Sequence, residues 1–344
     1  MKFFSLGSKD IGIDLGTSNI LVTLKDKGII INEPSVVALD RITNNIVAVG
    51  HKAKEMLGKT PEQIRAIKPL KDGAIADFTA TQIMISDILK KITKRYGIGR
   101  QRVVVGVPCN ITEVEERAIQ EAIVAAGAKE VFLIEEPLAA AIGEGLNIAD
   151  PTGNMILDIG GGITEIAVIS LGGIVISDFI KTAGEEIDNA IINYIKFSQD
   201  LAIGQITAEE VKKELGCAKS LIEEKTMEIR GRNLINGLPE NRIISSKEVE
   251  KAMKPSIDKI VELVRTTIEK TPPELVSDIV STGITITGGG ALIKNIDLVI
   301  QERIDIPVFV SKAPLECVAL GTEKVSSNLD KYGKTLSKKR IKKM

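Results

Sequence analysis

The chain contains a single histidine, His51, and no tryptophan among its 344 residues. One histidine argues against a catalytic triad built on histidine and excludes a histidine-rich zinc site. Aromatic residues make up only 3% of the sequence, which leaves few surfaces on which nucleic-acid bases could stack. The net charge of −1 gives no general attraction to a phosphate backbone. We therefore expect no nucleic-acid partner.

Cysteine and long apolar runs are scarce as well. Cys109, Cys217 and Cys317 are far apart in the sequence, so they form no CxxC-type metal site, and a disulfide framework is not expected. No apolar run reaches the roughly 18–20 residues of a membrane-spanning helix. The apolar part of the N-terminus is too short for a signal peptide. These absences predict a soluble protein in the reducing cytoplasm.

The length and the order of apolar segments predict two domains of the α/β class. A chain of 344 residues is too long for one ordinary core and suits two. Short apolar runs alternate with charged, helical stretches, which is typical of α/β proteins. Residues 11–15 and 155–158 each lead into a glycine-containing turn, and a second apolar run follows each turn. We expect a hairpin at each turn, so both sheets should be mixed.

The two glycine-containing turns are nearly alike. Each begins with an aspartate and continues with small residues, in the stretches Asp14-Leu15-Gly16-Thr17 and Asp158-Ile159-Gly160-Gly161-Gly162. Glycine permits close approach of the backbone to a ligand, and the N–H groups of such turns bind phosphate. One such turn alone could be an ordinary hairpin with a polar tip. Two copies predict that both clamp one polyphosphate, with the carboxylates facing a divalent cation through water.

Three further features leave alternatives open. The cluster Thr287-Gly288-Gly289-Gly290 could approach a nucleotide base or an α-phosphate, or could be only a tight turn. Glu136 begins a helix, where the helix dipole favours anions, and its carboxylate could also orient a water molecule. Glu209 and Lys212 lie one helical turn apart, a spacing that favours a solvated ion pair. No Walker A motif is present, so this is not a P-loop protein.

Both ends of the chain carry features that suit a membrane surface. The tail from Lys331 to Met344 is strongly basic. It is either a solvated, disordered tail or a segment attracted to anionic lipid by about 1 kcal/mol per basic residue. At the other end, Phe3, Phe4 and Leu6 follow Lys2. This short apolar segment could dip into a membrane interface but is too short to bind firmly alone.

Seven stretches between Asp10 and about Lys324 resemble the actin-like ATPase superfamily and, within it, the MreB family of bacterial filament proteins. They are IGIDLGTSN, NEPSVVA, KPLKDGAIADF, LIEEPLAAAIG, DIGGGITEIAVISLGG, KTPPELVSDI and ITGGGALI. The resemblance implies an actin fold with ATP and Mg²⁺ in a cleft between two related halves. The expected subdomains are IA (residues 1–31, 76–146 and 321–344), IB (32–75), IIA (147–184 and 249–320) and IIB (185–248).

The resemblance also assigns roles to residues. Asp14 and Asp158 would hold the hydrated metal ion, and Glu136 would position the attacking water. Glu209 and Lys212 would contact the nucleoside. The expected phosphate ligands are Thr17, Ser18, Asn19, Gly160, Gly161 and Gly162, and the expected adenosine-binding turn is Thr287, Gly288, Gly289 and Gly290.

One position departs from the family pattern. MreB proteins commonly have two threonines after the three glycines, and the first helps to position the attacking water. Here that position is Ile163, followed by Thr164. We expect nucleotide binding to survive this change and ATP hydrolysis to be slow.

The function that the resemblance implies is a homopolymer of paired protofilaments. These filaments would lie at the inner face of the cell membrane and help determine cell shape with other cell-shape proteins. A small-molecule kinase and a chaperone-type ATPase share the same superfold. The kinase alternative lacks a further catalytic aspartate or substrate-binding insertion that stands out. The chaperone alternative needs a substrate-binding domain after the ATPase, and the sequence ends at Met344.

Overall fold

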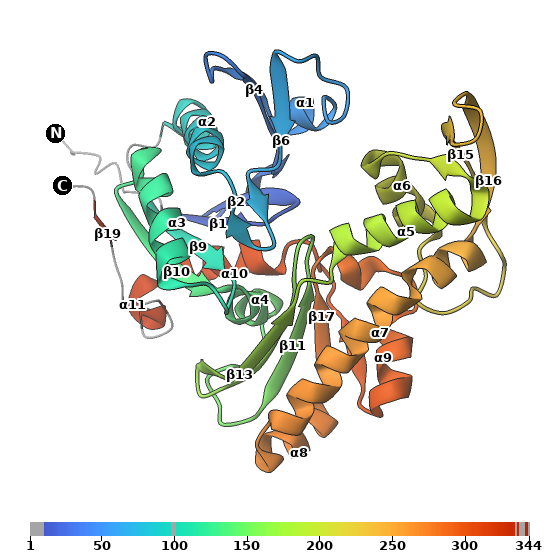
Figure 1. Cartoon of the computed structure of the whole chain (residues 1–344). Helices are drawn as coiled ribbons and strands as arrows, with labels where there is room; N and C mark the ends of the chain where they lie inside the picture. The colour runs from blue at the N-terminus through green and yellow to red at the C-terminus, as the bar shows by residue number, and fades with distance from the viewer. Residues whose placement is uncertain (1–9, 98–100, 334–335, 337–340, 343–344) are drawn as a thin grey trace. The chain divides into compact units, whose positions relative to one another are not determined.

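The computed structural model describes residues 10–97, 101–333, 336 and 341–342, which fold into two compact units (Figure 1). Unit 1 comprises residues 1–150, 171–173 and 316–344, and unit 2 comprises residues 151–170 and 174–315. The finer division into four subdomains stays a prediction. Among the described residues, no helix combines the length and apolarity needed to cross a membrane. Phe3, Phe4, Leu6 and most of the basic tail lie outside the described residues.

Unit 1 is built on a six-stranded mixed sheet in the order β19-β10-β9-β1-β2-β3. Strands β1, β2 and β3 form an antiparallel meander. Strands β9 and β10 run parallel to β1, and β19 pairs antiparallel to β10. The strands are β1 (Ile11–Leu15), β2 (Asn19–Leu24), β3 (Gly28–Pro34), β9 (Arg102–Val107), β10 (Glu130–Glu135) and β19 (Ile341–Lys342).

Helices cover both faces of this sheet. On one face, α2 (Phe78–Tyr96) and α3 (Glu113–Ala125) enclose a core that includes Ile11 and Ile13. On the other face lies α10 (Cys317–Ser327), which also packs against α4 (Glu136–Glu144). Two short helices complete unit 1, α1 (His51–Lys54) and α11 (Leu329–Tyr332).

Asp77, and Thr112 followed by Glu115, are typical helix-capping residues that predict helix starts, and Gly127 predicts the end of the second helix. Both helices begin where these residues predict. The Asp77 carboxylate accepts a hydrogen bond from the Ala80 N–H at the start of α2. Thr112 and Glu115 form the predicted capping box of α3. The predicted C-cap of α3 at Gly127 is one residue late, because the helix ends at Ala125 and is capped by Ala126.

Two small sheets complete unit 1, and one of them corrects the sequence analysis. The sequence between Pro61 and Pro69 predicts a connecting stretch, but these residues contain β6 (Ile64–Ile67), which pairs with β4. The strand is only four residues long and lies between two prolines, so the sequence around it is typical of a loop. It forms a strand because it pairs with β4, which is distant in the sequence. The first sheet contains β4 (Val37–Asp40), β5 (Ile46–Val49) and β6, and the second contains β7 (Leu70–Lys71) and β8 (Ala74–Ile75).

Unit 2 repeats the sheet of unit 1. Its five-stranded sheet has the order β13-β12-β11-β17-β18, with β12 antiparallel and β17 parallel to β11. The order β3-β2-β1-β9-β10 in unit 1 is the same pattern. The predicted mixed sheets and related halves are therefore confirmed. The strands are β11 (Asn154–Ile159), β12 (Thr164–Ser170), β13 (Gly173–Ile180), β17 (Ile284–Thr287) and β18 (Val308–Val310).

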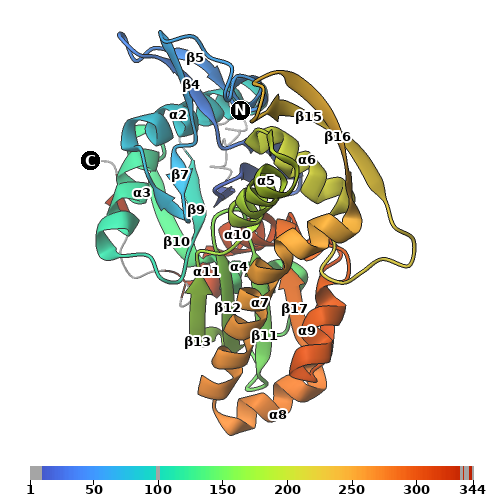
Figure 2. The ribbon, with the colours of Figure 1, turned by 45° about the vertical axis from the view of Figure 1, so that its right-hand side comes forward.

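A second sheet and several helices complete unit 2 (Figure 2). Helices α5 and α6 lie side by side in both views, and α7 packs on the sheet. The small sheet contains β14 (Leu201–Ala202), β15 (Thr226–Asn233) and β16 (Pro239–Ser245). The helices are α5 (Gly184–Gln199), α6 (Gln205–Leu215), α7 (Ser246–Lys270), α8 (Pro273–Thr282) and α9 (Ile296–Ile304), with one 3₁₀ turn, η1 (Gly289–Leu292).

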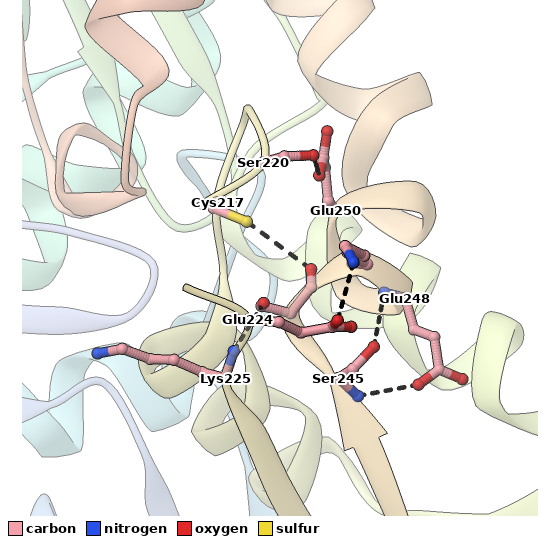
Figure 3. Close-up of polar contacts among 9 residues, drawn as sticks. Cys217, Ser220, Glu224, Lys225, Ser245, Glu248 and Glu250 are labelled. Atoms are coloured by element: carbon pink, nitrogen blue, oxygen red, sulfur yellow. Dashed lines mark hydrogen bonds and ion pairs between the residues drawn. The ribbon is translucent and has the colours of Figure 1, made fainter. Parts of the chain in front are cut away.

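The segment after α6 corrects a second expectation. The charged segment from Thr207 to Lys225 predicts one helix, but α6 ends at Leu215. Residues 217–225 instead form a loop held at the start of α7 (Figure 3). Ser220 donates a hydrogen bond to Glu250 at 2.6 Å, and Glu224 forms an ion pair with Lys247 at 2.8 Å. The charged residues that suggested a continuing helix instead pair with other helices, Glu224 with α7 and Lys219 with Glu302 of α9.

The crossing of α4 and α10 depends on close backbone contact. A Cβ atom on Gly143 of α4 would overlap the carbonyl oxygen of Cys317, and one on Gly321 of α10 would overlap that of Ala139. Side-chain movement cannot relieve these overlaps, because the overlapped carbonyl oxygens belong to the backbone. The two helices can keep this separation only with glycine at both positions.

We predict that Gly143→Ala lowers the free energy of unfolding by about 1–3 kcal/mol, the usual cost of overpacking. Helix propensity alone predicts the opposite sign, since alanine favours a helix by about 1 kcal/mol over glycine. Urea unfolding followed by circular dichroism measures the difference. Gly173→Ala is the matched control, because a Cβ atom there meets no atom within 4 Å. A Gly143→Ala protein as stable as the control variant would show that the crossing tolerates separation.

Candidate functional site

The first glycine turn, residues 16–19, connects β1 to β2 in unit 1 and is held by Ser35. The Ser35 hydroxyl donates a hydrogen bond to the Gly16 carbonyl at 2.6 Å, and its backbone N–H donates to the Ser18 carbonyl at 2.9 Å. Ser35 itself is fully buried. A buried serine thus fixes two carbonyl groups of the turn, which sets the conformation of the predicted phosphate-binding residues.

The three polar side chains of this turn differ in exposure. Thr17 is buried, and its hydroxyl accepts a hydrogen bond from the Gly73 N–H at 3.2 Å. Asn19 donates from its side-chain amide to the Asn32 side chain at 3.0 Å. Ser18 is exposed. The turn therefore presents hydroxyl and amide groups whose positions are partly set by neighbouring loops.

Asp14 and Glu136 come together at the carboxyl ends of parallel strands in unit 1. Asp14 pairs in register with Gly106 of β9, and Gly106 also pairs with Ile134 near the end of β10. Glu136 follows β10 as the first residue of α4. A Cβ atom on Gly106 would lie 3.3 Å from the Glu136 Cγ atom, so the Glu136 side chain lies over this glycine. Ligands of open α/β sheets bind at this edge.

The second glycine turn, residues 160–163, connects β11 to β12 in unit 2 and is held by a helix. The N–H groups of Gly184 and Glu185, at the start of α5, donate to the carbonyls of Gly160 and Gly161 at 3.1 and 2.8 Å. The Gly160 N–H donates to the Ile163 carbonyl at 3.0 Å and closes the turn. With no side chains of their own, residues 160–162 can offer a ligand only their backbone groups.

Asp158 is buried beside this turn and contacts the third glycine cluster. Its carboxylate accepts a hydrogen bond from the Thr287 hydroxyl at 3.0 Å. Gly288 has a φ of +79°, and a Cβ atom there would collide with the Asp158 carboxylate and the Ile159 carbonyl. Burial raises the pKa of Asp158 to about 6, and the Thr287 hydrogen bond only partly opposes this shift. A nearby cation would stabilise such a desolvated carboxylate.

Lys212 of α6 lies against the same part of unit 2. Its ammonium group donates to the Gly184 carbonyl at 2.8 Å and forms an ion pair with Asp188 at 2.7 Å. Glu209 forms an ion pair with Lys213 at 2.6 Å. The spacing of Glu209 and Lys212 favoured a solvated pair between them, but the structure gives each residue a partner elsewhere.

The residue pair after the three glycines has no exposed hydroxyl. Ile163 is buried, with 6% of its surface exposed. The Thr164 hydroxyl is also buried and donates to the Thr182 carbonyl at 2.7 Å. Thr164 therefore already uses its hydroxyl hydrogen within the fold.

The donor set suits a hydrated metal ion. In the part of the chain that the structure describes, no group of three or more histidine, cysteine, aspartate or glutamate side chains could hold a metal ion. Asp14 in unit 1 and Asp158 in unit 2 are single carboxylates beside glycine-containing turns. Mg²⁺ usually binds through one or two carboxylates, with waters and phosphate oxygens as its other ligands. Taken within its own unit, each aspartate fits the role of one carboxylate ligand of a hydrated Mg²⁺ ion.

Three structurally important residues were not singled out from the sequence: Ser35, Gly184 and Asp188. Each contacts residues that are distant in the chain, so the spacing of residues in the sequence does not indicate these contacts. Asp188 could have been noticed, because it directly follows Ile187 and lies three residues before Ile191 on the buried side of α5.

The repeated sheet pattern and the two aspartate-bearing turns define an actin-like protein. The crystal structure of MreB5 of Spiroplasma citri bound to ADP is similar, with a TM-score of 0.91 and 39% identity over 96% of this chain and 99% of that chain. The structure of a MamK double helical filament has a TM-score of 0.78 at 21% identity, over 92% of this chain and 98% of that chain. The MamK similarity supports the fold alone.

Sequence comparison is more specific. The model of the MreB/Mbl protein family matches residues 8–334. The cell shape-determining protein Mbl of Bacillus subtilis (strain 168) is 47% identical over 327 residues, which are 95% of this chain and 98% of that relative. The chain therefore belongs to the MreB/Mbl family of actin-like, cell shape-determining proteins of the bacterial cytoskeleton. The resemblance stated from the sequence motifs is confirmed.

Proposed function

We propose that this protein binds ATP with Mg²⁺ and assembles into homopolymeric filaments that help determine cell shape. The observation that carries the proposal is the repeated turn. Asp14 and Asp158 occupy the same register position in two sheets of the same strand order. Each aspartate is followed by a turn whose carbonyls are tied back into the fold.

The proposed nucleotide contacts divide between the units. In unit 1, Asp14 would hold the metal through water, and Thr17, Ser18 and Asn19 would bind phosphate oxygens. In unit 2, Asp158 would hold the metal, and the N–H groups of Gly161 and Gly162 would bind phosphate, while the Gly160 N–H closes the turn. Glu209, Lys212 and the turn Thr287, Gly288, Gly289 and Gly290 would bind the adenosine. Mg²⁺, when bound, neutralises phosphate charge.

Family membership favours a polymer over the alternatives of a small-molecule kinase and a chaperone-type ATPase. Those proteins share the superfold, whereas the family model matches residues 8–334 of this chain. We further propose that the filaments consist of paired protofilaments at the inner face of the cell membrane and act with other cell-shape proteins. The ADP-bound MreB5 structure supports the nucleotide part of the proposal.

Replacing Asp158 tests the nucleotide site. We predict that Asp158→Ala weakens the affinity for Mg²⁺-ATP at least about tenfold, or about 1.4 kcal/mol, because the metal loses one anchor. The same variant should lose the ATP-dependent pelleting expected of the wild-type protein. Titration with fluorescent ATP and electron microscopy of the pellet provide the two readouts. Glu186→Gln, an exposed change on α5, is the control, and equal affinities for the two variants would refute the site assignment.

Hydrolysis should be slow because of Ile163. A threonine there could hold the attacking water, whereas isoleucine offers no hydrogen bond, and the Thr164 hydroxyl already donates to Thr182. One well-placed polar contact is worth up to roughly 10²–10³ in rate, and less here if Glu136 already positions the water. We predict that Ile163→Thr releases phosphate at least about tenfold faster than the wild type at matched filament mass.

Ile163→Val is the matched control, since it changes the volume of the side chain without adding a hydroxyl. We expect this variant to hydrolyse ATP at the wild-type rate. Equal rates for the threonine variant and the wild type would show that Ile163 does not limit hydrolysis.

Membrane attachment through the chain ends forms the third part of the proposal. Each basic residue near an anionic surface contributes about 1 kcal/mol, and added salt should weaken the attraction. We predict that changing Lys338, Lys339, Arg340 and Lys343 to Gln reduces co-sedimentation with anionic vesicles but leaves pelleting with ATP unchanged. This variant keeps the chain length, and with it β19. Undiminished vesicle binding would exclude the tail and leave the segment around Phe3 and Phe4 to be tested.

A further inference from the structure

We propose that Asp188 is a positioning residue of the nucleotide site. Its carboxylate fixes the orientation of Lys212, and Lys212 in turn connects α6 to the second glycine turn. The inference rests on the proposed function, because Lys212 is one of the proposed nucleoside contacts.

The first argument is the burial of the Asp188–Lys212 ion pair. The two side chains expose only 7% and 16% of their surface, and their charged atoms lie 2.7 Å apart. The neighbouring pair of Glu209 and Lys213 on α6 exposes 27% and 65%. Removing two charges from water costs several kcal/mol per ion, so a buried pair adds little net stability. Such a pair is better explained by the orientation that it imposes on the lysine.

The second argument is the path from Lys212 to the glycine turn. Lys212 donates to the Gly184 carbonyl at 2.8 Å, and the Gly184 N–H donates to the Gly160 carbonyl at 3.1 Å. The next residue, Glu185, donates to the Gly161 carbonyl at 2.8 Å. One residue of α5 therefore lies between the ammonium group and the phosphate turn. Asp188 lies one helical turn further along α5 and forms its ion pair with the same ammonium group.

The third argument is geometric. Lysine has a long, flexible side chain and loses rotamer entropy when it is fixed. Two anchors on one helix, the Gly184 carbonyl and the Asp188 carboxylate, restrict the Lys212 ammonium group to one place beside the turn. An uncharged residue at position 188 would remove the stronger anchor. Lys212 would then sample other rotamers, and α6 would lose its charged attachment to α5.

This arrangement predicts a selective defect. The phosphate turn keeps its hydrogen bonds to Gly184 and Glu185 when Asp188 is changed, because those bonds use only backbone groups. The nucleoside contacts from α6 depend on Lys212. Asp188→Asn should therefore weaken the affinity for ATP about tenfold or more. The affinity for inorganic tripolyphosphate, which has no nucleoside, should change less than about twofold.

The experiment measures both affinities in Mg²⁺, by direct titration with fluorescent ATP and by competition with tripolyphosphate. Glu186→Gln removes an exposed carboxylate from the same turn of α5 and should change neither affinity. Circular dichroism establishes that each variant is folded. Equal losses for ATP and tripolyphosphate in Asp188→Asn would indicate a merely structural role and overturn the proposal.

A double-mutant cycle tests whether Asp188 acts through Lys212. Lys212→Met should reproduce the selective loss, and adding Asp188→Asn to it should cause no further loss in the ratio of ATP to tripolyphosphate affinity. The double variant also leaves no unpaired buried charge, so it serves if Asp188→Asn alone does not fold. Additive effects would overturn the proposal. A wild-type protein that binds neither ligand would instead refute the proposed function.

Discussion

The hydrogen bonds from the start of α5 to the carbonyls of Gly160 and Gly161 are the constraint on which the candidate site of unit 2 depends. A turn of three glycines has no side chains to hold its shape, so its conformation must come from its surroundings. The two N–H groups of Gly184 and Glu185 supply that order. Because the Gly160 and Gly161 carbonyls are fixed in this way, the N–H groups of Gly161 and Gly162 have defined directions, as the proposed binding of phosphate requires. Asp158 and Lys212 are then placed relative to a fixed turn.

The equivalent turn of unit 1 is also held in a fixed conformation, but by different groups. The strand order and the register of the aspartate are the same in both sheets, but the first turn is held by the buried side chain of Ser35. Its residues Thr17, Ser18 and Asn19 carry hydroxyl and amide groups, whereas the second turn offers only its backbone. The duplicated architecture thus presents side-chain ligands from one unit and backbone ligands from the other.

Local signals in the sequence were sufficient for elements whose ends are defined by neighbouring residues. The sequence predicts a long helix from Ser246 to Lys270 that ends before two prolines, and α7 has these bounds. The prediction was wrong where distant contacts decide, as at β6, which is ordered by pairing with β4, and at the end of α6. The same distinction applies to the site. The pattern around Asp14 and Asp158 is local and visible, whereas Asp188 and Ser35 act across the fold and are not.

The position of Ile163 shows why binding and hydrolysis can be separated in this fold. Its carbonyl accepts the hydrogen bond from Gly160 that closes the second turn, and any residue can supply that carbonyl. The side chain takes no part in this hydrogen bond, so isoleucine in place of threonine leaves the backbone of the turn intact. It removes only a hydroxyl that could hold water. Under the proposed function, nucleotide-dependent assembly and hydrolysis would therefore depend on different atoms of this residue, and a filament protein could keep the first while the rate of the second falls.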